Sequence, residues 1–130
     1  IFMFADIRNA TGIAEQLGEA LYFNLLKDFF RDIAPAILHT YGEVYQYVGD
    51  EMVVSWTYKN GSRNNNCVEC FFKMKADLHK KQDEFVKRFG IHPKFKAGLH
   101  LGTVTTGEIG SLKKEIIFNS QQYYSKTDDE

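Results

Sequence analysis

The sequence has few cysteines, almost no net charge and no long apolar segment, and each of these absences excludes a class of protein. Two cysteines among 130 residues cannot form a disulfide framework, which favours a reducing compartment. Sixteen basic against seventeen acidic residues give a net charge of −1, so no overall positive field attracts nucleic acid or an anionic membrane. No apolar run approaches the roughly 18 residues of a membrane helix, and no signal peptide opens the chain. We therefore expect a cytoplasmic domain without a nucleic-acid partner, whose parent protein can still be membrane-tethered.

Length and composition are those of a single globular domain. The chain is 44% hydrophobic and 25% charged, which are ordinary values for a folded protein. It begins with Ile1 inside an apolar run that extends to Ala5. Because a natural domain rarely begins in the middle of a strand, we expect a piece of a longer protein, incomplete at both ends.

Strand-like and helix-like patterns alternate along the chain. The apolar run over 1–5 predicts a strand that is buried on both faces and followed by Asp6. Apolar residues recur every three or four positions over 19–39, which predicts a helix that Gly42 ends, and again from Cys67 to Phe89. Further strands are expected over 43–48, 52–56, 94–101 and 103–109, with a polar loop over 59–66 and the last two strands paired around Gly102. The order β-α-β-β-α-β, with an extra strand, predicts an α+β, ferredoxin-like fold in which two helices cover one face of an antiparallel sheet.

Two aspartates are expected to meet at one edge of this sheet. In the ferredoxin-like topology the first and third strands are antiparallel neighbours, so the end of one lies beside the start of the other. Asp6 ends the first strand and Asp50 begins the third. Adjacent carboxylates repel each other, and Mg²⁺, which prefers oxygen ligands, relieves that repulsion. The alternative is that Asp6 only terminates a strand and Asp50 only forms a turn.

The residues after Asp6 favour a phosphate site. Asn9, Ala10 and Thr11 form a short turn that opens a helix. The first N–H groups of a helix lack intrahelical partners and readily bind phosphate.

Three segments together resemble the catalytic domain of class III nucleotidyl cyclases. They are FMFADIRNAT (residues 2–11), YQYVGDEMVV (residues 45–54) and GLHLGTVTTGEIGS (residues 98–111), in the order and spacing of that family. The resemblance covers residues 1–118. Residues 119–130 form a tail that does not match the family and is possibly discontinuous with what precedes it.

The resemblance implies a reaction and a set of site residues. A nucleoside triphosphate would cyclise by attack of its 3′-oxygen on its own α-phosphate, with release of pyrophosphate. Asp6, Asp50 and the backbone carbonyl of Ile7 would hold two Mg²⁺ or Mn²⁺ ions, and Asn9, Ala10 and Thr11 would bind phosphate. The resemblance also implies a homodimer with active sites at its interface, and regulatory domains in the parent chain.

Several positions depart from the family pattern. Gln46 stands where a Lys or Glu usually reads the base, and Ile117 takes the second base-reading position. Lys113, expected on the loop after Gly110, is a candidate for binding the triphosphate, with a solvated surface lysine as the alternative. The Asn and Arg that stabilise the family's transition state are not found after Phe118.

Four functions are compatible with these residues. The leading hypothesis is an adenylate cyclase that makes cyclic AMP, because Gln46 is not acidic; a guanylate cyclase is the first alternative. A diguanylate cyclase is the second, because VGDEM over 48–52 resembles that family's hairpin. A catalytically degenerate nucleotide-binding or dimerisation module is the third.

Overall fold

The computed structural model of the chain describes the backbone of residues 1–102, 104–109, 113–118 and 122–127, and the side chains up to residue 102. In chain order the elements are β1 (Phe2–Ile7), α1 (Ala10–Leu17), α2 (Glu19–His39), β2 (Glu43–Val48), β3 (Glu51–Ser55), α3 (Tyr58–Ser62), the 3₁₀ turn η1 (Arg63–Asn65), α4 (Asn66–Lys80), α5 (Gln82–Phe89), β4 (Phe95–Leu101), β5 (Val104–Ile109), β6 (Lys113–Phe118) and β7 (Gln122–Thr127). No helix in these ranges is long and apolar enough to cross a membrane.

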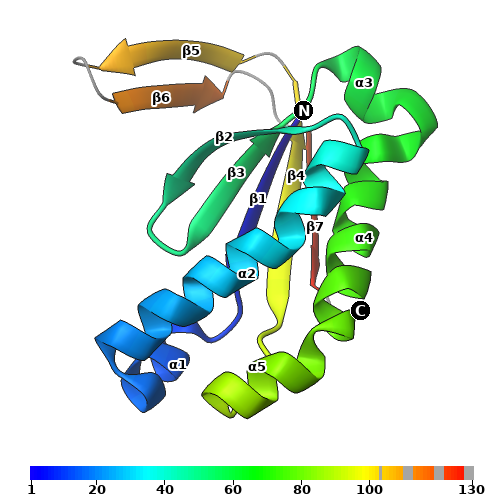
Figure 1. Cartoon of the computed structure of the whole chain (residues 1–130). Coiled ribbons are helices and arrows are strands. Elements are labelled where there is room, and N and C mark those ends of the chain that lie inside the picture. Colours follow the sequence, from blue (N-terminus) through cyan, green and yellow to red (C-terminus); the bar gives the residue numbers. More distant parts are fainter. Residues whose placement is uncertain (103, 110–112, 119–121, 128–130) are drawn as a thin grey trace.

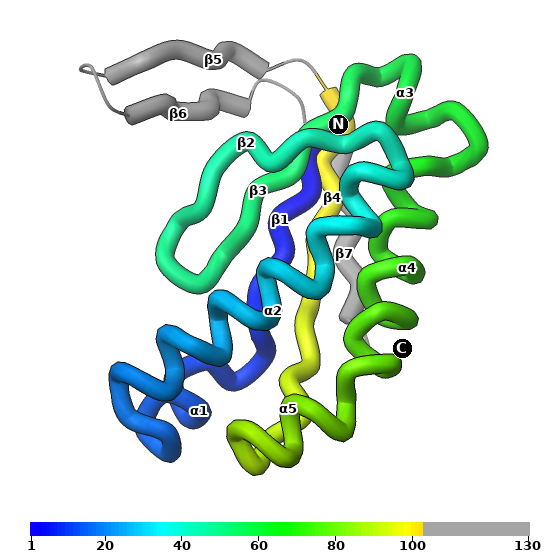
Figure 2. Tube along the Cα trace, in the orientation of Figure 1, coloured from blue at the N-terminus to red at the C-terminus, as the bar shows by residue number. Residues whose placement is uncertain are grey.

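The main sheet is antiparallel, with strand order β2-β3-β1-β4-β7, and β5 pairs with β6 in a second, two-stranded sheet. Helices α2 and α4 lie on one face of the main sheet (Figure 1), and the Cα trace shows α2 crossing over β1 and β4 (Figure 2). Because β1 lies between β3 and β4, this is the predicted α+β, ferredoxin-like arrangement.

Alternation along β1 divides its residues between the two faces of the sheet. Met3, Ala5 and Ile7 point into the core under the helices, where none is more than 2% exposed. On the α2 face predicted from the helical period, Phe29, Ile33 and Ile37 are fully buried against them, while Tyr22 and Leu26 are partly buried. The predicted strand is therefore confirmed, but only its helix-facing side is fully covered, since Phe4 on the other side is half-buried.

Two expectations about the second half of the chain are wrong. Residues 94–101 and 103–109 do not pair with each other: β4 pairs with β1 and β7, while β5 pairs with β6. Local alternation predicts a strand but carries no information on its partner. The helix expected from Cys67 to Phe89 is divided at Lys81 into α4 and α5, and the acidic first turn of α5 stabilises the new helix start.

The segment expected to be a polar loop, 59–66, instead forms most of α3, the 3₁₀ turn η1 and the first residue of α4. Thr57 caps α3, because its hydroxyl oxygen accepts a hydrogen bond from the backbone N–H of Asn60 at 3.1 Å. Asn64 and Asn65 then adopt positive φ angles of 52° and 56°, which end this turn before α4 begins.

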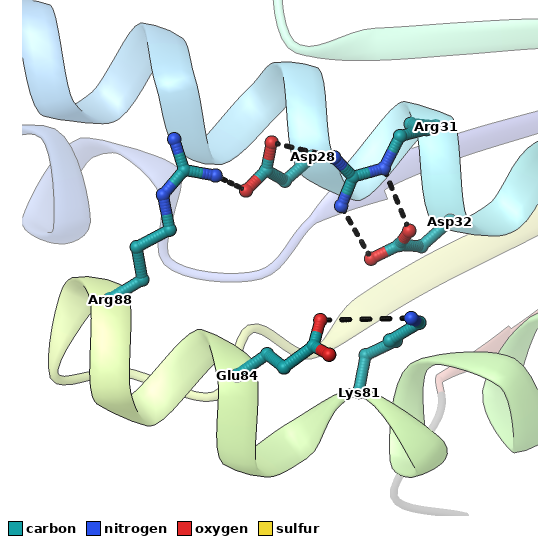
Figure 3. Close-up of polar contacts among 6 residues, drawn as sticks. All are labelled: Asp28, Arg31, Asp32, Lys81, Glu84 and Arg88. Carbon is teal, nitrogen blue, oxygen red and sulfur yellow. Dashed lines mark hydrogen bonds and ion pairs between the residues drawn. The ribbon is translucent and has the colours of Figure 1, made fainter.

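The ion pair of Arg88 with Asp28 attaches helix α5 to α2, and further ion pairs within α2 and at the start of α5 surround it (Figure 3). Arg88 donates to Asp28, whose other oxygen lies 3.4 Å from Arg31. Arg31 also contacts Asp32 at 3.0 Å, and this hydrogen bond raises the pKa of the Arg31 guanidinium. Exposed pairs of this kind contribute little singly, but the shared Asp28 connects two elements that are distant in sequence.

Trp56 closes the core at the end of β3. Its indole N–H donates to the backbone carbonyl of Thr40 at 2.9 Å, and only 5% of the residue is exposed. Helix α2 ends at His39, before the expected Gly42, and Tyr41 adopts the left-handed conformation that follows it (φ 63°). Gly42 instead lets the indole approach: a Cβ there would lie 2.9 Å from the ring, and one at Gly61 would lie 2.8 Å from the Cβ of Trp56.

We predict that Trp56→Phe lowers the free energy of unfolding by about 2 kcal/mol. The substitution leaves a cavity and removes the donor that satisfies the buried Thr40 carbonyl. Urea denaturation followed by circular dichroism measures the change, with Tyr58→Phe, at a 66% exposed residue, as the control. Equal stability of the Trp56→Phe variant and wild type would contradict this account of the indole.

Candidate active site

Asp6 lies at the centre of a charged row that crosses three strands. It is paired directly with Glu51 on β3 and with Lys96 on β4, and directly opposed residues share a face of the sheet. This is the face away from α2 and α4, called here the open face, which also carries Phe4 and Val53. The register of β1 therefore places one basic and two acidic groups side by side.

Asp50 approaches this row from the β2–β3 hairpin. It occupies the turn directly before Glu51, next to Gly49, whose φ is 60°. The hydroxyl of Tyr22 on α2 donates a hydrogen bond to Oδ2 of Asp50 at 3.3 Å. Asp6 and Asp50 are also close enough for the charge on Asp50 to raise the pKa of Asp6. The structure thus brings the two predicted aspartates together.

The surroundings of the cluster raise the pKa values of Asp6, Glu51 and Tyr22, which disfavours their ionised forms. Burial is the largest cause of the raised pKa of Asp6; Lys96 opposes the shift and Asp50 adds to it. Glu51 has a raised pKa through burial and the charges of Asp6 and Asp50. Burial, then Asp50, raise the pKa of Tyr22 to about 12. The cluster thus contains three carboxyl groups and one lysine, an excess of acidic groups.

A pocket of about 390 Å³ lies between the start of α1 and the β2–β3 hairpin. Its lining residues are Ala10, Thr11, Ala14, Glu15, Tyr22 and Asp50. As expected, a helix starts at this point: α1 begins at Ala10 and Asn9 is its N-cap residue. Asn9 adopts a left-handed conformation (φ 56°) and its side chain makes no capping hydrogen bond, so it leaves the first N–H groups of α1 available to a ligand.

Gln46 lies on the open face because of an irregularity in β2. The register of β2 against β3 shifts between Val44 and Gln46, so that Gln46 is paired with Val53. Val53 is in turn paired with Phe4, on the same side of the sheet as Asp6. Without this bulge Gln46 would face the helices.

For the remaining predicted site residues, Ile7, Lys113 and Ile117, the structure gives less information about a role in the site. The side chain of Ile7 is buried in the core, so only its backbone can contribute to a site. Lys113 begins β6 and Ile117 lies within it, but their side chains are outside the described residues. In the predicted tail, 122–127 form β7 beside β4, and 119–121 and 128–130 are outside the described part.

Three polar residues of the site were not predicted. Glu51 and Lys96 become neighbours of Asp6 only through the strand register, which sequence alternation does not define. The helical period over 19–39 places Tyr22 on the apolar face of α2, and its ring does pack against the core. Its hydroxyl, the only polar group on that predicted face, is the signal that could have identified it.

The donor set suits a hard divalent cation that shares its coordination sphere with a substrate. Within the side chains described, no three His, Cys, Asp or Glu residues are arranged to enclose a metal ion. Mg²⁺ is usually bound by one or two carboxylates, and substrate phosphates and water complete its coordination. Asp6 and Asp50, beside an open pocket, fit that pattern.

We predict that Asp6→Asn stabilises the protein at neutral pH and raises its Tm by a few degrees. Since the folded chain holds the Asp6 proton more tightly than the unfolded chain does, ionisation of this carboxyl opposes folding above its folded pKa. The advantage of the variant should therefore disappear near pH ~3, where wild-type Asp6 is protonated.

Thermal unfolding of both proteins across this pH range measures the effect. Glu43→Gln, at an exposed position of β2, is the control and should change Tm little at any pH. A variant less stable than wild type at neutral pH would show that Asp6 contributes favourably to folding.

Known proteins resemble this chain in sequence and in fold. Residues 1–123 match the family described as the adenylate and guanylate cyclase catalytic domain. A curated relative, adenylate cyclase 2 of Rhizobium meliloti (strain 1021), is 32% identical over 122 residues, which are 91% of this chain and 32% of the relative. The chain thus spans about a third of that relative's length.

Solved structures resemble the fold at low sequence identity. The guanylyl cyclase Cya2 matches with a TM-score of 0.77 and 22% identity, over 90% of this chain and 62% of that one. The guanylate cyclase domain of RhGC from Catenaria anguillulae, in complex with GTP, matches with a TM-score of 0.70 and 17% identity, over 98% and 73%. The family match covers residues 1–123, which include Asp6 and Asp50. The chain therefore belongs to the adenylate and guanylate cyclase catalytic domain family.

Proposed function

We propose that this chain is the catalytic domain of an adenylate cyclase, which converts ATP to cyclic AMP and pyrophosphate. The observation that carries the proposal is the meeting of Asp6 and Asp50 beside the pocket at the start of α1, in a chain of the cyclase family. The solved relative in complex with GTP supports a nucleoside triphosphate as the substrate class.

Each residue of the site has a proposed role. Asp6, Asp50 and the carbonyl of Ile7 bind two Mg²⁺ or Mn²⁺ ions, and the N–H groups around Asn9, Ala10 and Thr11 bind phosphate oxygens. When bound, the two ions would lower the pKa of the attacking 3′-hydroxyl and neutralise charge on the leaving pyrophosphate. The chain's own contribution is to hold the triphosphate with its 3′-oxygen near the α-phosphate.

A homodimer with active sites at its interface is part of the proposal. Val44 and Val48, on strand β2 at the sheet edge, are 38% and 53% exposed, and a partner subunit would cover them. Regulatory domains in the parent protein are also proposed, since the curated relative is about three times as long as this chain. A cytoplasmic location, in a parent that can be membrane-tethered, stays a prediction.

The preference for ATP rests on Gln46 and on the curated relative, which is named an adenylate cyclase. Gln46 lies on the open face with Asp6, where it pairs with Val53, two residues along β3 from Glu51 of the charged row. Its amide both donates and accepts hydrogen bonds, so it can pair with adenine's amino group and ring nitrogen.

We predict that the full-length protein produces cyclic AMP from ATP with Mg²⁺ or Mn²⁺, and that Asp50→Ala lowers turnover at least about 100-fold. Chromatographic identification of the product measures this, with Asp77→Ala on α4 as a carboxylate control that keeps its activity. A cyclic dinucleotide from GTP would identify a diguanylate cyclase. Tight triphosphate binding without any product would identify a degenerate binding module.

We also predict that Gln46→Glu increases the ratio of GTP to ATP turnover by about tenfold, the effect of one discriminating hydrogen bond. A carboxylate accepts hydrogen bonds from the guanine N1–H and amino group, whereas adenine N1 is itself an acceptor. The kcat/KM values for both nucleotides measure the ratio, and Glu43→Gln on the same strand is the control. An unchanged ratio would show that Gln46 does not contact the base, and wild-type preference for GTP would identify a guanylate cyclase.

A further inference from the structure

Tyr22 connects the core of the domain to the proposed metal site. Its ring packs against the core cluster, one turn before Leu25 and two turns before Phe29, both of which are fully buried. Its hydroxyl lies at the other end of the side chain, in the wall of the pocket that Thr11 and Asp50 also line. The ring of Tyr22 is therefore fixed by packing against the core, and its hydroxyl reaches the proposed metal site.

Among the residues that the structure describes, few contacts other than that with Tyr22 hold Asp50 in place. It lies in the two-residue turn between β2 and β3, at the edge of the sheet, and the adjacent Gly49 is exposed. The hairpin contacts α2 through the rings of Tyr47 and Phe30, whose centroids are 4.9 Å apart. Among the described residues, the Asp50 carboxylate makes one side-chain hydrogen bond, which its Oδ2 accepts from the hydroxyl of Tyr22.

We propose that Tyr22 is a positioning residue that holds the Asp50 carboxylate in its metal-binding orientation. A carboxylate has two oxygens, and the phenol occupies Oδ2, so Oδ1 remains free to bind a cation. Groups that hydrogen-bond to a metal ligand fix its orientation, and their loss weakens metal binding. This inference rests on the proposed function, because it assumes that Asp50 binds a divalent cation.

A purely structural tyrosine is the competing interpretation. Tyrosines with buried rings commonly direct their hydroxyl toward any available acceptor. Here, however, the acceptor is a carboxylate of the charged cluster, and both groups line the same pocket. A structural role would affect folding stability, whereas a positioning role affects cation affinity, so the two interpretations can be separated by experiment.

The test measures Mn²⁺ binding to the full-length protein without nucleotide, by the electron paramagnetic resonance signal of free Mn²⁺. Tyr22→Phe removes only the hydroxyl and should weaken binding about tenfold. Tyr47→Phe is the matched control: it lies in the same hairpin as Asp50, keeps its ring contact with Phe30, and should bind like wild type. Asp50→Ala should abolish this binding, and adding Tyr22→Phe to it should have no further effect.

The outcomes distinguish this inference from the proposed function. If Asp50→Ala binds Mn²⁺ like wild type, Asp50 is not a ligand, and both the metal assignment and the role of Tyr22 are wrong. If Asp50→Ala loses binding and Tyr22→Phe does not, only the role of Tyr22 is wrong. In turnover, Tyr22→Phe should raise the Mn²⁺ concentration needed for half-maximal rate, and saturating Mn²⁺ should restore kcat. Lower kcat at saturation with unchanged Mn²⁺ dependence would support the structural interpretation instead.

Discussion

The site and the core both depend on the register of β1 between its two antiparallel neighbours. One set of alternate residues, Met3, Ala5 and Ile7, fills the space under the helices, and Asp6 belongs to the other set. A shift of one residue would bury the Asp6 carboxylate in the apolar core and expose Ile7. Burial of the apolar set therefore also places Asp6 between Glu51 and Lys96, and packing energy determines where the charges lie.

This arrangement concentrates an electrostatic cost at the place where a substrate is proposed to bind. Asp6 and Glu51 both have raised pKa values, because each is partly buried and lies near other carboxylates. A folded domain tolerates such a cluster because the core beneath it is continuous across α2, α4 and the sheet. A cation bound there, as proposed, would lower this cost and stabilise the folded domain.

The sequence predicts those features that depend on residues close together in the chain, and it predicts poorly those that depend on residues far apart in the chain. The helical period of α2 and the order of the first four strands follow from local patterns, and the topology then brings Asp6 and Asp50 together. Glu51, Lys96 and the open-face position of Gln46 depend on strand register and a bulge, which no local pattern specifies. The same limit explains why β4 was assigned the wrong partner. The periodicity of α2 predicts only a packing role for Tyr22, and its hydrogen bond to Asp50 depends on where the β2–β3 hairpin lies.

The position of Trp56 has a practical consequence for spectroscopy. It is the single tryptophan of the chain, and it directly follows β3, whereas Asp50 directly precedes that strand. A strand of this length separates the two by about 20 Å, at roughly 3.3 Å per residue. The indole is buried and hydrogen-bonded, so its fluorescence should report loss of tertiary structure and respond weakly to ligands at the carboxylate cluster. The domain thus carries an intrinsic probe that can separate unfolding from binding.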